Sequence, residues 1–188
     1  AGRNFWNEFG TKLADLHQNT HSFFGLDHDN YIGSMVQKNN PHPDFNSFFI
    51  LQRIEPLLKE ARNKGAFSVS DTRYFESLFR SLHNIIPPEK PSLVHGDLWS
   101  GNFLVMPEGS PCLVDPAVYY GHREADIAMS LLFGGFDPAF YEAYNRTWPL
   151  EKGWQKRMDI FNLYPLLVHV NLFGGSYAGQ VLRIIRQF

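Results

Sequence analysis

The sequence predicts a mainly α-helical fold with a small β-hairpin element, an α+β domain, and three observations support this prediction. Of the 188 residues, 44% are hydrophobic, which is enough to build a core without disulfides or metals. Apolar residues recur at helical spacing through most of the chain. The stretch 92–115 instead holds short apolar runs divided by turn residues. We find no linker or repeat, so residues 1–188 are expected to form a single unit.

Helical spacing recurs on both sides of that stretch. Apolar residues three and four positions apart predict helices in these segments: 4–18, 44–64, 71–86, 123–133, 138–146 and from 154 onward. Pro56 is expected to kink or break the second helix, and Asp71 to cap the third. Segment 20–43 has no such periodicity and is expected to be a long loop.

Strands are predicted at 92–95, 103–106 and 111–115, and the last two should pair as a hairpin around a four-residue turn. In that register Asn102 lies opposite Asp115, with Cβ atoms about 4.5 to 5.5 Å apart. A carboxylate and an amide oxygen at that spacing can share one Mg²⁺. The sequence therefore predicts a metal site at these two residues, unless a bulge shifts the register.

Asp97 precedes Asn102 by five residues, in the loop that leads into the hairpin. A carboxylate there could orient a hydroxyl and accept its proton while the metal neutralises a phosphate. His95 is expected to hold the loop through a buried hydrogen bond. The same acids could instead cap turns. The pattern favours phosphoryl transfer.

The order His95-x-Asp97-x4-Asn102 followed by Asp115 resembles the catalytic loop and metal-binding aspartate of the protein-kinase-like superfamily. Glycine at 96 and proline at 116 make it more similar to the aminoglycoside-phosphotransferase branch. Within that branch, several segments resemble the fructosamine (ketosamine) 3-kinase family: 25–33, 95–102, 115–117, 120–126 and 133–136.

The resemblance implies the C-terminal lobe of a protein-kinase-like fold. It also implies ATP-dependent phosphorylation of the 3-hydroxyl of a ketosamine, which is a deglycation repair reaction. Asp97 would be the catalytic base, Asn102 and Asp115 the Mg²⁺ ligands, and Asp126 a brace for the catalytic loop. Family members carry an N-terminal nucleotide-binding lobe, and no such region precedes Phe5. We therefore expect ATP and Mg²⁺ to serve the complete protein, and little activity from residues 1–188 alone.

Two further residues are candidates for contact with the substrate. Trp99 could cover the apolar face of a sugar or of its amine substituent, or could belong to the core. His28, with neighbouring acids, could form a rim that attracts the substrate's amine, or could lie in a solvated loop. The run from Phe133 to Phe136 is more typical of a helix stop than of a ligand contact.

The composition of the chain limits the kinds of partner that the protein can bind. The net charge of -2 offers no basic excess for nucleic acid. The single cysteine, Cys112, excludes an internal disulfide framework and favours a reducing, cytoplasmic compartment. No apolar stretch approaches the roughly 18 residues needed to span a bilayer. We expect a small-molecule substrate, and the sequence leaves the oligomeric state open.

Several alternatives stay open. The acceptor could be an aminoglycoside, choline or a homoserine-like alcohol, or the chain could be a non-catalytic binding lobe. A metal-dependent hydrolase would use a different set of residues: His95, Asp97, Asp115 and His122. The run 174–179 superficially resembles a phosphate loop but lacks the Lys-Ser/Thr pair that such a loop requires.

Overall fold

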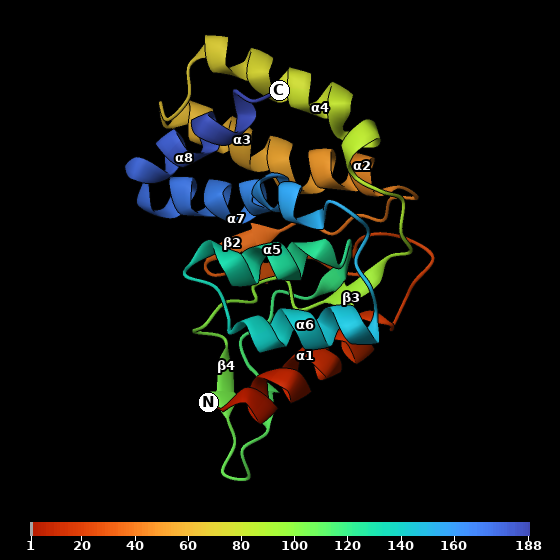
Figure 1. Ribbon diagram of the computed structural model, residues 1–188. Coiled ribbons are helices and arrows are strands. Elements are labelled where there is room, and N and C mark those ends of the chain that lie inside the picture. The colour runs from red at the N-terminus through yellow and green to blue at the C-terminus, as the bar shows by residue number, and fades with distance from the viewer. Residues whose placement is uncertain (1) are drawn as a thin grey trace.

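The computed structural model describes residues 2–188 as a helical body with three two-stranded sheets. Helix α7 (Met158–Phe173) runs through the middle of that body (Figure 1) and is buried along most of its surface. Its polar residues have internal partners, because Asn162 donates to the carbonyl of Ala128 and Asn171 to that of Leu57. None of the helices in 2–188 is long and apolar enough to cross a membrane.

The other helices pack around α7 in two groups. Their bounds are α1 (Arg3–His17), α2 (Phe45–Phe48), α3 (Glu55–Asn63), α4 (Val69–Ile85), α5 (Glu124–Leu132), α6 (Pro138–Thr147) and α8 (Ser176–Ile185). Figure 1 shows α3, α4 and α8 above α7, and α5, α6 and α1 below it. Helical spacing therefore located the helical segments, but the stretch predicted from 154 onward is divided into α7 and α8.

Two details of the helices differ from the prediction. The helix predicted over 44–64 is divided by a π-helical segment, Phe49–Ile54, and Pro56 lies in the first turn of α3, where no backbone donor is needed. Asp71 is not the N-cap of α4. Ser68 caps that helix, and Asp71 closes the capping box from the third helical position.

The strands pair as three antiparallel ladders. Their bounds are β1 (Asn30–Ile32), β2 (Met35–Gln37), β3 (Ser92–Val94), β4 (Phe103–Val105), β5 (Pro111–Leu113) and β6 (Tyr119–Gly121). β1 pairs with β2, β3 with β6, and β4 with β5. The prediction located β3, β4 and β5 but missed β1, β2 and β6.

The register predicted for the β4–β5 hairpin is wrong by one residue. Phe103 pairs with Leu113, which places Asn102 opposite Val114. The N–H of Val114 donates to the carbonyl of Asn102 at 3.1 Å. Asp115 therefore lies one position beyond Asn102's partner.

The turn of the hairpin explains the shift. Gly109 adopts a φ of +88°, which closes a three-residue loop with a left-handed last position. Met106 donates to the carbonyl of Ser110 at 2.9 Å across this loop, instead of facing Pro111. Asp115 itself has a φ of +49°, a conformation that aspartate tolerates better than most residues, and here the chain leaves the strand.

Aromatic packing fixes the hairpin to the helices beneath it. The ring centroid of Phe103 lies 5.2 Å from that of Phe9 in α1 and 5.4 Å from that of Phe136, just before α6. Phe140 of α6 lies within 5.2 Å of Phe9. The base of β4, where Asn102 sits, is thus held against the α1–α6 pair.

Candidate functional site

Asp126 anchors the loop that carries Asp97. Its buried carboxylate accepts hydrogen bonds from the N–H groups of His95 at 2.7 Å and Gly96 at 2.9 Å. His17 lies 3.0 Å from the same carboxylate and 2.7 Å from the hydroxyl of Tyr144. Burial by itself would raise the pKa of Asp126, but the hydrogen bond from His17 and the charges of His17 and His95 lower it. An ionised Asp126 therefore holds two consecutive amides of this loop.

His95 links the loop to the strand ends around it. Its Nε2 lies 3.0 Å from the carbonyl of Val114, and its Nδ1 accepts the N–H of Asp97 at 3.3 Å. Its own carbonyl accepts from Ala117. Gly96 has a φ of +82°, and a Cβ there would lie 2.1 Å from the carbonyl of Ala117, so this position requires glycine.

Asp97 and Asn102 are in direct contact. The side-chain amide of Asn102 donates to the Asp97 carbonyl at 2.8 Å and to its carboxylate at 3.0 Å. Because the amide nitrogen is committed to Asp97, the amide oxygen is the atom left for a cation. Burial raises the pKa of Asp97, and the nearby carboxylate of Asp115 acts in the same direction, against the hydrogen bond from Asn102 and the charge of His95.

The metal ligands that the sequence predicts therefore meet near Asp97, although not through the predicted pairing. Asn102 is buried and Asp115 is exposed at the base of the hairpin. Their donors are an amide and a carboxylate oxygen, which suit Mg²⁺ better than a transition metal. Within residues 2–188 no three His, Cys, Asp or Glu side chains are grouped to hold a metal ion. The donor set fits an ion that takes part of its coordination from phosphate oxygens.

His122 does not join this group. Its Nε2 lies 3.2 Å from the carbonyl of Pro87, and its Nδ1 accepts the N–H of Glu124 at 3.3 Å. Both ring nitrogens are thus engaged inside the protein. This observation counts against the alternative in which His122 and His95 would bind a hydrolytic metal.

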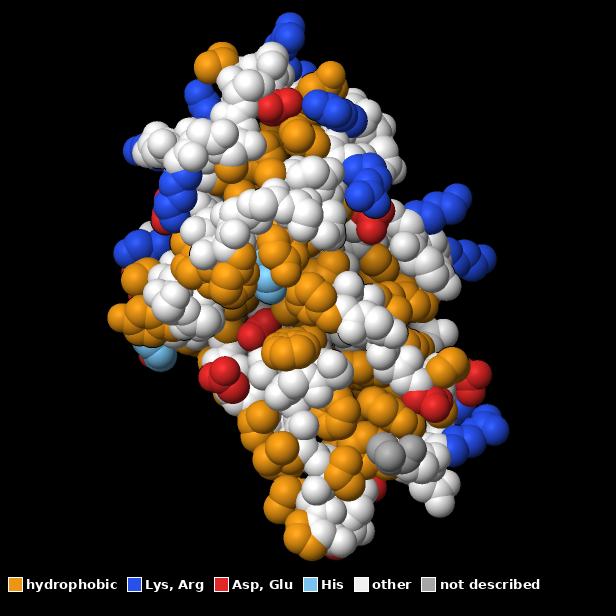
Figure 2. Space-filling model, turned by 90° about the vertical axis from the view of Figure 1, so that its left-hand side faces the viewer, with side chains coloured by type: hydrophobic (Ala, Val, Ile, Leu, Met, Phe, Trp, Pro, Cys, Tyr) orange, Lys and Arg blue, Asp and Glu red, His pale blue; other side chains and the backbone are white. Residues whose placement is uncertain are grey.

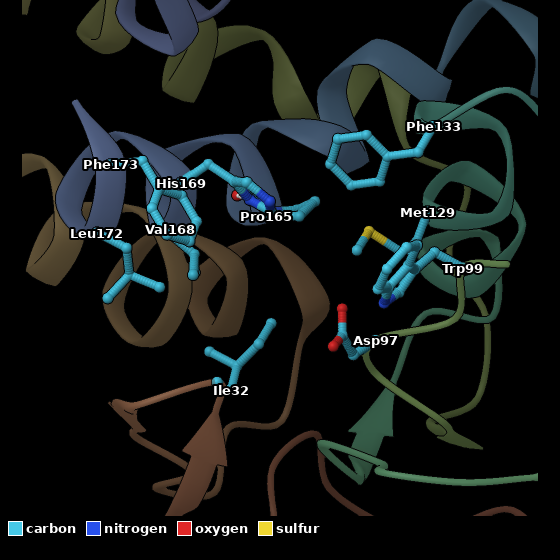
Figure 3. Close-up of a pocket in the computed structure, with 11 residues that line it drawn as sticks. Ile32, Asp97, Trp99, Met129, Phe133, Pro165, Val168, His169, Leu172 and Phe173 are labelled. Atoms are coloured by element: carbon cyan, nitrogen blue, oxygen red, sulfur yellow. Dashed lines mark hydrogen bonds between the residues drawn. The ribbon is translucent and has the colours of Figure 1, made fainter. Parts of the chain in front are cut away.

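The carboxylate of Asp97 opens on a cavity of about 270 Å³ between the loop that carries Asp97, α5 and α7 (Figure 3). The residues that line it are Ile32, Gly33, Asp97, Trp99, Met129, Phe133, Pro165, Val168, His169, Leu172 and Phe173. Trp99, a candidate from the sequence, lies in the wall beside Asp97. Its ring is folded over Gly101, where an added Cβ would lie only 2.4 Å from the indole.

His28 is not among these lining residues. Its exposed ring contacts the carboxylate of Asp27 at 2.5 Å. The neighbouring Asp29 accepts from Lys38 at 2.6 Å and from the N–H of Asn39 at 3.0 Å. The acidic rim expected around His28 is thus occupied by internal contacts, and His28 as a substrate contact stays a prediction.

The sequence analysis missed most of the pocket wall. Ile32 comes from the unpredicted β1 strand, while Phe133 and His169 come from the end of α5 and from α7. His169 did leave a signal, since it is a polar residue in an otherwise apolar helix. For Phe133 the sequence predicts only a helix stop. The two glycines that follow it do adopt positive φ, and Phe133 lines the cavity as well.

Comparison with known proteins identifies the family. A family model described as fructosamine kinase matches residues 1–188. An Enterococcus faecium protein, provisionally named a ketoamine kinase, is 44% identical over 189 residues, which is 100% of this chain and 68% of the relative. The chloroplastic protein-ribulosamine 3-kinase of Arabidopsis thaliana is 38% identical over 188 residues, covering 96% of this chain and 56% of that protein.

A solved structure agrees with these matches. A crystal structure from Thermobifida fusca, provisionally described as a fructosamine-3-kinase, superposes with a TM-score of 0.92 at 38% identity and covers 99% of this chain and 65% of its own. The chain thus spans between 56% and 68% of the length of these relatives. Since the family match runs from end to end and the solved relative shares the fold, the chain belongs to the fructosamine kinase family.

Proposed function

We propose that this chain is the acceptor-binding and catalytic lobe of an ATP-dependent kinase that phosphorylates the 3-hydroxyl of a ketosamine. The observation that carries the proposal is the position of Asp97. Its partly buried carboxylate faces the cavity, on a loop fixed by Asp126, next to the oxygen donors of Asn102 and Asp115. Family membership supports the ketosamine as substrate class and ATP as donor.

The proposal extends to the complete protein. The lobe would correspond to the C-terminal lobe of a protein-kinase-like fold, with the nucleotide-binding lobe in the part of the longer protein outside residues 1–188. Removing sugar adducts from amines, a deglycation repair in the cytoplasm, is the role that we assign to it.

The chemistry follows from the site. Ionised Asp97 would accept the proton of the substrate's 3-hydroxyl as that oxygen bonds to the γ-phosphorus, while the bond to the β-phosphate oxygen breaks and ADP leaves. Burial raises the pKa of Asp97 and so makes its carboxylate a stronger base. Asn102 both orients Asp97 and, with Asp115, would hold Mg²⁺, which neutralises phosphate charge when bound.

The pocket also favours a ketosamine over an aminoglycoside. Aminoglycosides carry several positive charges, which a binding site must balance with carboxylates. Among the described lining residues, Asp97 is the one carboxylate, and most of the others are apolar. A substrate with a single amine and an uncharged sugar suits this wall better.

The test uses the full-length gene product and follows ATP consumption with a fructosamine, an aminoglycoside and choline. We expect turnover on the fructosamine alone, and a loss of about 10²- to 10⁴-fold in kcat for Asp97→Asn, the range usual for a general base. Asp15→Asn, an exposed aspartate on α1, is the matched control and should retain activity.

Three results would count against the proposal. Equal turnover by Asp97→Asn would place the base elsewhere. Turnover on another acceptor would change the substrate class. A folded protein that binds ATP but phosphorylates none of these acceptors would favour a binding role.

A further inference from the structure

The wall of the cavity beyond Asp97 is a continuous row of aromatic rings. The ring centroid of Trp99 lies 6.1 Å from that of Phe133, that of Phe133 lies 5.2 Å from His169, and that of His169 lies 5.5 Å from Phe173. Figure 3 shows the carboxylate of Asp97 at one side of the cavity, beside Trp99, and Phe173 at the opposite side, and both residues line the same cavity. A ligand that reaches Asp97 can therefore extend along these rings.

The far end of this row is exposed to solvent. Phe173 is 68% exposed, Phe133 39% and Leu172 37%. Figure 2 shows the hydrophobic side chains gathered on the face of the molecule that lies at the left of Figure 1. Large apolar side chains at the mouth of a cavity are typical of a site that binds an apolar group.

The charges of the cavity wall also limit which ligands can bind there. Asp97 is the only carboxylate among the described lining residues, and none of them is a lysine or an arginine. The Nδ1 of His169 is 2.8 Å from the carbonyl of Pro165, four residues earlier in α7, which leaves only Nε2 for a ligand. Within residues 2–188, a carboxylate on the substrate would face Asp97 with no lysine or arginine of the pocket lining to pair with it, and burying an unpaired charge is costly.

The chemistry of a ketosamine places its amine substituent against this wall. The amine nitrogen lies three bonds from the carbon that bears the 3-hydroxyl, so a hydroxyl at Asp97 directs the substituent along the aromatic row. The protonated amine is favoured there by the nearby carboxylate and by the ring faces.

We propose that this pocket selects ketosamines whose amine carries an uncharged aryl or branched alkyl group, and disfavours those derived from free amino acids, which carry a carboxylate. The inference rests on the proposed function and names the substrate class within it. Phe173 and Leu172 are its specificity-determining residues, since they line the open end of the pocket.

A matched set of substrates tests the inference on the full-length protein. The fructosamines of benzylamine and of 4-(aminomethyl)benzoate differ only in a carboxylate, and the fructosamine of ethanolamine carries a small, uncharged substituent on its amine. We expect kcat/KM for the benzylamine derivative to exceed that of both others by about tenfold. Calorimetric binding of the same compounds should follow the same order, which separates affinity from the chemical step.

Two variants test whether residues of the cavity wall determine this substrate preference. Phe173→Ala should reduce the benzylamine-to-ethanolamine ratio of kcat/KM about fivefold, because it removes the exposed end of the row. Leu172→Lys supplies the missing cation and should raise the relative use of the benzoate about fivefold or more. Phe23→Ala and Leu51→Lys make the same changes at exposed positions outside the pocket lining and should leave both ratios unchanged.

The outcomes distinguish this inference from the proposed function. Equal kcat/KM for the three fructosamines would overturn the inference and leave the kinase assignment standing. So would a preference for the benzoate in the wild-type protein, or selectivity that both pocket variants preserve. Failure to phosphorylate any fructosamine would overturn the proposed function itself.

Discussion

Two irregular segments meet at the cavity, and they are held in place by different means. The catalytic loop depends on one ionised side chain, because Asp126 binds two loop amides and His17. The β1–β2 hairpin, which supplies Ile32 to the same cavity, is held instead by several contacts around Arg53 and by the exposed ion pair between Lys38 and Asp29.

Arg53 is almost fully buried, yet its close partners in residues 2–188 are carbonyls, an amide and aromatic rings. Its guanidinium donates to Asn39 at 2.7 Å and lies 4.0 Å from the ring centroid of Tyr119. Gln37 joins this network through Asn30, whose side-chain oxygen accepts from both Gln37 and Asn39, and the Gln37 amide also donates to the carbonyl of Ala117 at 3.0 Å. The comparison teaches that one carboxylate binds two consecutive amides of the loop that carries Asp97, whereas several separate contacts hold the hairpin.

Loss of Asp126 should give the largest effect. Asp126→Ala leaves two loop amides and the Nε2 of His17 buried without a partner, and we expect the free energy of unfolding to fall by about 3–5 kcal/mol. Urea unfolding measures it. Asp126→Asn keeps the shape of the side chain and should lower the free energy of unfolding by less. This variant can therefore still be measured if the alanine variant does not fold. If Asp126→Ala lowered the free energy of unfolding by less than 1 kcal/mol, the idea that the Asp126 carboxylate anchors this loop would be wrong.

Removal of Arg53 should cost less. Arg53→Met keeps much of the volume and eliminates a buried charge, so we expect a loss of about 1–2 kcal/mol in the free energy of unfolding, together with weaker substrate binding as the hairpin loosens. Arg62→Met, at an exposed position of α3, is the matched control. If Arg53→Met destabilised the protein as much as Asp126→Ala, the distinction between the two segments would be lost.

Gly101→Ala tests whether the catalytic loop also positions Trp99. The added Cβ would lie 2.4 Å from the indole, so the ring has to leave its present position in the cavity wall. We expect KM for the ketosamine to rise about three- to tenfold with a smaller change in kcat, measured in the full-length protein. Gly179→Ala, where an added Cβ meets nothing within 4 Å, should leave both constants unchanged. An unchanged KM for Gly101→Ala would remove Trp99 from the binding site.

The smallest effect that we expect is a pH dependence of stability, which arises from His122 at the start of α5. Burial lowers the pKa of His122, against the charges of Glu89 and Glu124, which raise it. The unfolded chain therefore takes up a proton near the ordinary histidine pKa, about 6.5, before the folded chain does. Stability from the neutral ring is present above that pH and is lost as the pH falls below it.

Thermal unfolding between pH 7.5 and 5 measures this dependence. His122→Gln should make the decline with falling pH shallower, whereas replacement of the exposed His28 by Gln should leave the slope as it is. A wild-type protein that becomes more stable as the pH falls through this range would contradict the assignment.

Local spacing predicted that Asp97 and Asn102 lie together, because they are close in the sequence. Asp97 and Asn102 are five residues apart in one loop, and their contact needs only that loop to fold. The pairing of Asn102 with Asp115 could not be predicted as well. That pairing depends on the register of the hairpin, which shifts by one residue with the length of the turn. The left-handed conformation of Gly109 sets that length.

The sequence by itself determined the helices, the β4–β5 hairpin, the segment with the acid–amide–acid order, and the family resemblance that the comparisons confirm. Periodicity and motif spacing are local properties, and each of these features is local. Only the tertiary structure brought Phe133, His169 and Phe173 from α5 and α7 to the side of Asp97. Their positions depend on how buried helices pack, which no short stretch of sequence encodes.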